Sequence, residues 1–301
     1  MDAPVEFVKR LLPSVVSLHT TVPRGHPSTR ILGNERMGSG VIVDASGLIL
    51  TVNYVVMGGQ SIDVAFVRGR RIKGEIVAQD FEVGLAVVRV KRQGLPVAPL
   101  GSPAAVERGD PVVLVASTGG QERRVAGGLV TYLGEFEAHW EYLLERGIVA
   151  SAPNPGFGGG GLFTLTGRLV GIVSLNLSEI ARASLAIPLD LYQEHEREFL
   201  RYGRIVSRPR RAWLGVFAHP VEEGVVVAGV VPDGPGDKGG LQEGDLIVSL
   251  NAEEVGSRRD LYMSLWRHEP GEKLTLEVMR ENKLQRVELT GGDRAYFFRQ
   301  L

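Results

Sequence analysis

The amino-acid sequence predicts a mainly β protein built from short strands joined by tight turns. Runs rich in valine, isoleucine and leucine are only a few residues long, and 39 glycines are spread through the 301-residue chain. The length favours two domains. Because strand patterns follow one another without intervening helices for most of the chain, a barrel or a sandwich is expected rather than alternating βαβ units.

The predicted strands come in pairs along the first part of the chain. SGVIVDASGLILTV at 39–52 has two apolar runs around an Asp-Ala-Ser-Gly turn, which is the pattern of a hairpin. SIDVAFVRGRRIKGEIVAQD predicts a second hairpin that turns at 68–70. GLAVVRV, PVVLVAS and GGLVTYLG are further short strands, and GLFTLTGRLVGIVSL predicts a strand, a Thr-Gly turn and a strand.

The first long helical pattern appears late, at 188–202. Tyr192 and Phe199 fall on one face at helical spacing. Pro188 suits the first turn of a helix, and Gly203 stands where a C-terminal cap belongs. One continuous helix is therefore expected here.

A basic segment after this helix, RIVSRPRR, is expected to be a linker to a second block of strands. That block has a helix signal near 257–267, opened by a serine with an aspartate three residues on. The predicted division is a first domain at 1–195, a helix end and linker at 196–211, a second domain at 212–290 and a C-terminal tail at 291–301.

Composition excludes several classes of function. The formal net charge is −1, so no overall charge favours nucleic acid or an acidic membrane surface. The chain has no cysteine, which rules out disulfides, thiolate metal sites and a cysteine nucleophile. No apolar run approaches a membrane-spanning length, and the N-terminal MDAPVEFVKRLLP does not have the pattern of a signal peptide. Either a cytoplasmic protein, or a mature form after removal of a signal or a truncated form, is expected.

The segment NPGFGGGGL at 154–162 raises the question of a cofactor, because it contains the spacing G-x-G-x-x-G. A dinucleotide-binding turn must open a helix, whose N-terminus holds the pyrophosphate. Two strand patterns follow this segment instead, so the cofactor hypothesis is rejected. None of the six histidines is spaced i, i+4 from another, and no metal site is predicted. We therefore expect no cofactor.

The order of the motifs leads to a family. GSGVIVDASGLILTVNYVV, GLAVVRV, VAGGLVTYLG, NPGFGGGGL, GRLVGIVS and LAIPLDL are followed by RAWLGV and VVPDGPGDKGGLQEGDLIVSLNAEEV. This series, over roughly residues 5–290, resembles the HtrA/Deg family of trypsin-like serine proteases with a C-terminal PDZ domain. The resemblance implies a trypsin-like double β-barrel in the first domain, followed by a PDZ domain.

Three departures from the family pattern fall on its catalytic triad. The resemblance places the catalytic histidine at Tyr54, the aspartate at Gly84 and the nucleophilic serine at Gly158. Glycine has no hydroxyl with which to form an acyl-enzyme, and a phenol with a pKa of about 10 is a poor general base at neutral pH. Backbone N–H groups near Gly158 are expected to keep the outline of an oxyanion hole, which provides no nucleophile.

The sequence therefore predicts an inactive serine protease homologue, a pseudoprotease, that binds peptides or proteins as a scaffold, chaperone or sensor in protein quality control. Two alternatives stay open. The first is a hydrolase with a non-standard nucleophile, for which Ser151 and Ser174 are the nearest serines. The second is a regulatory subunit of an active HtrA protease.

The resemblance assigns peptide binding to the second domain. It places the carboxylate-binding loop, whose backbone N–H groups face the terminal carboxylate of a peptide, at Trp213, Leu214, Gly215 and Val216. An extended peptide is expected to add as a strand beside 216–218. The expected partners are peptides or proteins with apolar C-termini.

Three further sites follow from the same resemblance. Leu261 and Leu265, one helical turn apart, either line the pocket for the terminal side chain or pack the core of the small domain. The chain's own apolar end, Leu301, is a candidate ligand for the groove. Phe7 with Leu11 or Leu12 is a candidate contact in a homotrimer, or in a mixed oligomer with an active HtrA. The family resemblance favours an extracytoplasmic location if a signal has been removed.

Overall fold

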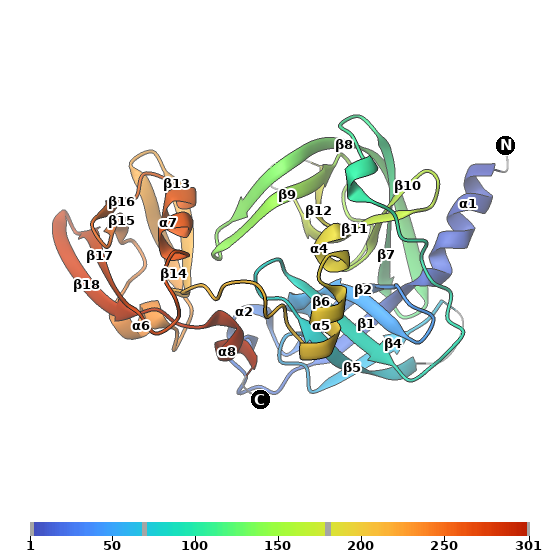
Figure 1. Ribbon diagram of the computed structural model, residues 1–301, viewed down its shortest axis with the longest axis horizontal. Coiled ribbons are helices and arrows are strands. Elements are labelled where there is room, and N and C mark those ends of the chain that lie inside the picture. Colours follow the sequence, from blue (N-terminus) through green and yellow to red (C-terminus); the bar gives the residue numbers. More distant parts are fainter. Residues whose placement is uncertain (1–2, 68–70, 178–181, 300–301) are drawn as a thin grey trace. The chain divides into compact units, whose positions relative to one another are not determined.

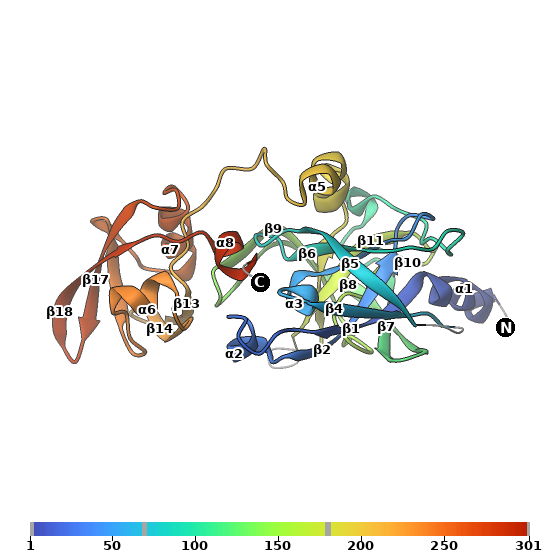
Figure 2. The same cartoon turned by 90° about the horizontal axis from the view of Figure 1, so that it is seen from below.

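The computed structural model describes residues 3–67, 71–177 and 182–299, with side chains from residue 7 onward. Figure 1 shows the ribbon, and Figure 2 shows it turned by 90°. The chain forms two compact units. One contains Met1–Phe136 and Leu144–Val206, and the other contains Glu137–Leu143 and Ser207–Leu301. The seven residues Glu137–Leu143 thus belong by their contacts to the C-terminal unit.

The first unit begins with a closed antiparallel barrel in the strand order β1-β2-β3-β6-β5-β4. Its strands are β1 (Val15–Thr21), β2 (Glu35–Ile42), β3 (Leu48–Val52), β4 (Ser61–Ala65), β5 (Arg71–Gln79) and β6 (Leu85–Val90). The helical segments beside them are α1 (Ala3–Leu11), η1 (Leu12–Ser14), α2 (Thr29–Leu32) and α3 (Asn53–Val56). The hairpin predicted at 39–52 is the β2–β3 pair. The turn predicted at 68–70 lies outside the described residues.

A second closed barrel follows in the order β10-β11-β12-β9-β8-β7. Its strands are β7 (Pro111–Gly119), β8 (Glu122–Ala138), β9 (Tyr142–Ala150), β10 (Gly161–Thr164), β11 (Leu169–Asn176) and β12 (Ser184–Pro188), with η2 (Pro103–Ala105) before them. Strands β8 and β9 are long and follow each other with only three residues between them. The expectation of a barrel or a sandwich is confirmed as two barrels of consecutive strands, although β8, with 17 residues, is not a short strand.

The single helix predicted at 188–202 is wrong. Pro188 is the last residue of β12, where it pairs with Gly171, and it opens no helix. Two short helices follow, α4 (Asp190–Gln193) and α5 (Glu196–Tyr202). At Pro188 the pairing of β12 with β11 outweighs the local helix preference, because the ladder buries this residue in the barrel. Gly203 does adopt the left-handed conformation (φ 69°) and closes α5 as predicted.

The second unit is built on one antiparallel sheet in the order β13-β14-β15-β17-β18, with β16 paired to β15. Its elements are β13 (Val216–Val221), β14 (Gly224–Val230), α6 (Pro235–Gly239), β15 (Leu246–Leu250), β16 (Glu253–Glu254), α7 (Arg258–Leu265), β17 (Lys273–Arg280), β18 (Lys283–Thr290) and α8 (Arg294–Arg299). Strand β13 lies at an edge of the sheet. Ser257 caps α7 by accepting the Asp260 N–H, as the serine–aspartate spacing predicted.

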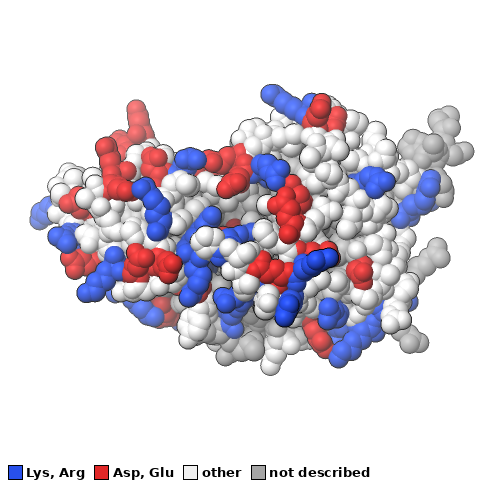
Figure 3. Space-filling model, in the orientation of Figure 1, with Lys and Arg blue, Asp and Glu red and all other residues white. Residues whose placement is uncertain are grey.

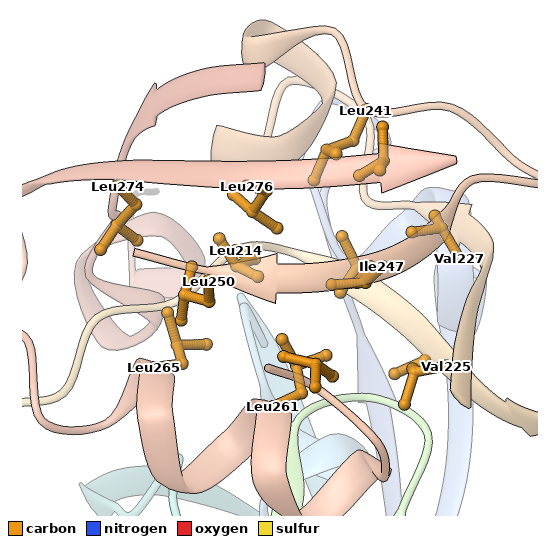
Figure 4. Packing of buried hydrophobic residues seen from close by; sticks show 14 of the residues in the cluster. Leu214, Val225, Val227, Leu241, Ile247, Leu250, Leu261, Leu265, Leu274 and Leu276 are labelled. Atoms are coloured by element: carbon orange, nitrogen blue, oxygen red, sulfur yellow. The ribbon is translucent and has the colours of Figure 1, made fainter. Parts of the chain in front are cut away.

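The core of this unit lies between α7 and the sheet. Leu261 and Leu265 point from α7 toward the strands and are fully buried among Leu214, Ile247 and Leu250 (Figure 4). On the face shown in Figure 3, basic and acidic side chains are interspersed, in keeping with a net charge of −1. None of the helices among the described residues is long and apolar enough to span a membrane.

Candidate functional site

Tyr54 lies in α3, directly after β3, and its side chain is held in a polar contact with the second barrel. Its hydroxyl donates to the Ser174 carbonyl oxygen at 2.9 Å. Burial raises the pKa of Tyr54 to about 12. The phenol is therefore neutral at physiological pH, and its O–H group already donates a hydrogen bond to a backbone carbonyl. It does not have the properties of a general base.

Gly158 lies opposite this hydroxyl, in the loop between β9 and β10. A Cβ atom built on Gly158 would overlap the Tyr54 hydroxyl, and it would lie 3.0 Å from Tyr54 Cζ and 3.1 Å from the Ser174 carbonyl oxygen. The phenol thus fills the space into which a side chain at position 158 would project. Tyrosine at 54 and glycine at 158 are sterically matched to each other.

Gly84 is joined to the same site through the backbone. Its carbonyl oxygen accepts the Asn53 N–H at 2.7 Å, at the start of α3, and its own N–H donates to the Asp80 carbonyl at 3.1 Å. Gly84 has φ 83°, in the left-handed region, where a residue with a side chain is strained. The structure therefore brings together the three positions that the resemblance assigned to the triad.

The glycine loop is tied to both barrels through its backbone. The Ser39 N–H of β2 donates to the Gly158 carbonyl at 2.7 Å, the Phe157 N–H donates to Ser117 of β7 at 2.8 Å, and the Gly159 N–H donates to Val173 of β11 at 2.7 Å. The N–H groups of Phe157 and Gly159 are thus directed to carbonyls of the protein itself, and the expected oxyanion-hole outline stays a prediction for the N–H of Gly158.

Arg36, which the sequence analysis did not single out, holds α3 in position. It is buried in β2, and its guanidinium donates to the carbonyls of Tyr54 (3.0 Å) and Met57 (2.8 Å) and to the Ser28 hydroxyl (2.6 Å). Burial lowers the pKa of Arg36 to about 10, so it stays charged at neutral pH. No sequence signal marked it, because an arginine in a strand is ordinarily a surface residue.

Replacing Arg36 with methionine is expected to destabilise the first unit by roughly 3 kcal/mol, because buried carbonyls at the end of α3 lose their donor. Urea unfolding followed by fluorescence measures the change. Arg108→Met, at an exposed position of the same unit, is the matched control and is expected to change stability little. Equal urea midpoints of unfolding for the two variants would contradict a stabilising role of Arg36.

The carboxylate-binding loop predicted in the second unit does bind a carboxylate in the structure. The Glu141 carboxylate accepts from the N–H groups of Leu214 (3.0 Å, Oε2), Gly215 (2.7 Å, Oε1) and Val216 (3.0 Å, Oε1). Gly215 has φ 76°, which allows successive N–H groups to converge on one anion. Trp213 contributes differently, since its N–H donates to the Gly292 carbonyl.

Glu141 was missed by the sequence analysis, because it lies 73 residues before Leu214. Burial raises the pKa of its carboxyl group, while the N–H donors of the loop and the charge of Arg294 act in the opposite direction. Glu141 has φ 56°, a conformation uncommon for a residue with a side chain. No local pattern in the sequence predicts the contact of Glu141 with the loop.

The remaining predicted residues of this unit lie in its core or its tail. Leu261 and Leu265 belong to the buried cluster, and their role as a pocket wall stays a prediction. The indole of Trp213 packs on Phe297 (5.0 Å between ring centroids) and Phe298 (5.6 Å) of α8. Leu301, the candidate tail ligand, lies outside the described residues.

With the fold and these sites in view, comparison with known proteins identifies each unit. A family model described as a trypsin-like peptidase domain matches residues 38–172, and one described as a PDZ domain matches residues 212–290. The class is therefore a trypsin-like double barrel followed by a PDZ domain, as the resemblance implied.

Similar proteins narrow this class to a family. A probable periplasmic serine endoprotease, DegP-like, from Pseudomonas fluorescens is 32% identical over 95% of this chain and 61% of its own length. A protein of the same name from Ectopseudomonas mendocina is 30% identical over the same shares. The HtrA-type protease AlgW with a tripeptide matches with a TM-score of 0.59 and 29% identity, over 97% of each chain. The chain belongs to the HtrA/DegP family, and it spans about three fifths of those DegP-like relatives.

Proposed function

We propose that this chain is a non-catalytic HtrA-type protein that binds peptides through its PDZ domain. The observation that carries the proposal is the convergence of three backbone N–H groups on one carboxylate at Leu214–Val216. A terminal carboxylate has the same charge and the same pair of oxygens, so a peptide end fits this loop. The solved AlgW structures with a tripeptide or a decapeptide agree with this use of the fold.

The second half of the proposal is the loss of catalysis. No hydroxyl stands at Gly158, no imidazole stands at Tyr54, and the Tyr54 hydroxyl occupies the space that a side chain at 158 needs. In a well-studied serine protease, removal of the triad lowers turnover by roughly 10⁶. The relatives are named as serine endoproteases. In contrast to them, this chain is proposed to have kept the family fold without the proteolytic reaction.

One preparation tests both halves. Casein and a peptide ester are expected to be hydrolysed no faster than in buffer, while a labelled peptide with a free apolar C-terminus binds saturably. The same peptide with an amidated C-terminus is expected to lose at least about 10-fold in affinity, because it lacks one charged acceptor. Turnover that follows the protein through purification would contradict the loss of catalysis.

The alternative of a hydrolase with another nucleophile is tested at Ser151. Ser151 is exposed, and its hydroxyl accepts the Leu129 N–H at 3.0 Å. A serine-reactive probe that labels the wild-type chain but not Ser151→Ala would support that alternative over the proposal. Absence of labelling in both would count against that alternative.

Assembly and location are part of the same proposal. The DegP-like relatives are named as periplasmic, which favours the extracytoplasmic location for this chain. Among the candidate contacts of a homotrimer or a mixed oligomer, Leu11 is buried inside its own chain, so Phe7 and Leu12, both partly exposed, are the better candidates.

A further inference from the structure

The Glu141 carboxylate is only one of several contacts that seat residues Glu137–Leu143 on the PDZ domain. These residues, the end of β8, the turn and the start of β9, are called the hairpin tip below. The His139 carbonyl accepts the Ala218 N–H at 2.7 Å. Ala218 lies in β13, the edge strand of the sheet, so the hairpin tip bonds to the edge where an added peptide strand is expected.

Helix α7 holds the other side of the hairpin tip. The Tyr262 hydroxyl donates to the Ala138 carbonyl at 2.6 Å and accepts the Glu141 N–H at 3.0 Å. Arg258 pairs with the Glu137 carboxylate at 3.0 Å. Tyr262 is fully buried, so its hydroxyl needs both partners.

The hairpin tip makes two further contacts with the PDZ domain. Leu143 packs against the buried core cluster of the unit, and Arg294 of α8 donates to the Glu141 carbonyl oxygen at 3.2 Å. The hairpin tip therefore makes the three kinds of contact expected of a bound peptide: a carboxylate in the loop, a main-chain bond to the edge strand and apolar packing.

We propose that the hairpin tip is an internal ligand of the PDZ groove, with the Glu141 side chain in the place of a terminal carboxylate, and that an external peptide binds only by displacing it. The proposal rests on peptide binding as the proposed function. The hairpin tip contacts the carboxylate-binding loop, the edge strand β13 and α7. Because an external peptide needs the same three elements, the hairpin tip and the peptide cannot bind at the same time. Binding of a peptide then releases the end of the β8–β9 hairpin from the PDZ domain.

The expected size of the effect follows from competition within one chain. A tethered ligand acts at an effective concentration in the millimolar range when its connection is short. If the hairpin tip is docked in about 90–99% of molecules, the apparent affinity for an external peptide falls about 10–100-fold. Removing the Glu141 carboxylate frees the three N–H groups and is expected to restore that affinity.

Amide hydrogen exchange on the full chain, without any peptide, tests docking directly. The N–H groups of Leu214 and Gly215 donate to Glu141, so Glu141→Ala is expected to speed their exchange about 10-fold or more. Glu145→Ala, at an exposed position of the same hairpin, is the matched control and keeps the wild-type rates. Tyr262→Phe keeps the buried ring, removes the two hydrogen bonds of its hydroxyl to the hairpin tip and is expected to speed exchange by a smaller factor. Unchanged rates in both Glu141→Ala and Tyr262→Phe would overturn the proposal.

Peptide affinity tests the competition. Fluorescence anisotropy with a labelled ten-residue peptide ending in a free leucine is expected to give about 10–100-fold tighter binding to Glu141→Ala than to wild type, and no change for Glu145→Ala. Equal affinities for wild type and Glu141→Ala would overturn competition. Failure of every variant to bind would refute the proposed peptide-binding function, while hydrogen exchange still decides whether the hairpin tip is docked.

Discussion

Gly158→Ser is expected to produce a less stable protein without hydrolytic activity. The new Cβ overlaps the Tyr54 hydroxyl and comes within 3.1 Å of the Ser174 carbonyl, so the site is overpacked. Overpacking of this kind costs about 1–3 kcal/mol. The new hydroxyl also finds no imidazole to accept its proton. Urea unfolding and a peptide-ester assay on the same preparation measure the two effects.

A double-mutant cycle shows whether Tyr54 is the cause. Tyr54→His with Gly158→Ser removes the phenol, so the double variant is expected to be more stable than the sum of the single changes by about 1–2 kcal/mol. Gly127→Ser is the matched control, since a Cβ at that position has no atom within 4 Å and its stability is expected to stay near wild type. Strict additivity in the cycle would refute steric matching between positions 54 and 158.

Leu261→Ala is expected to destabilise the PDZ-containing unit by about 2–5 kcal/mol, because Leu261 is fully buried in its core cluster. Met263→Ala, on the exposed side of α7, is the control and is expected to change stability by less than about 0.5 kcal/mol. Calorimetry and chemical unfolding measure both. A Leu261→Ala protein with wild-type stability but altered peptide affinity would instead identify Leu261 as a pocket wall.

Local structure was predictable wherever the cause is local. Ser257 and Asp260 are three residues apart and form the cap of α7, and Gly203 ends α5 because glycine adopts positive φ without strain. The turn between β2 and β3 follows from its own residues in the same way. The helix start expected at Pro188 is wrong because Pro188 pairs with Gly171, a partner that no local pattern reveals.

The same distinction between local and distant causes applies to the residues of the candidate sites. The order of motifs located Tyr54, Gly84 and Gly158, and the loop at Trp213–Val216, because the residue types themselves depart from or match a family pattern. The buried cation of Arg36 was not predictable, since its partners, Ser28, Tyr54 and Met57, come from separate segments. The position of Glu141 was not predictable either, since the loop that binds its carboxylate lies 73 residues away in the chain.

The sequence by itself thus determined the β architecture, the two-domain order and the residue types at the three positions that the resemblance assigns to the triad, because each follows from residue type, spacing or order along the chain. Only the tertiary structure decided that the Tyr54 hydroxyl fills the space beside Gly158, and that the Glu141 carboxylate lies in the loop of the PDZ domain. Both are contacts between segments at least 73 residues apart, made by packing and hydrogen bonding after the chain has folded.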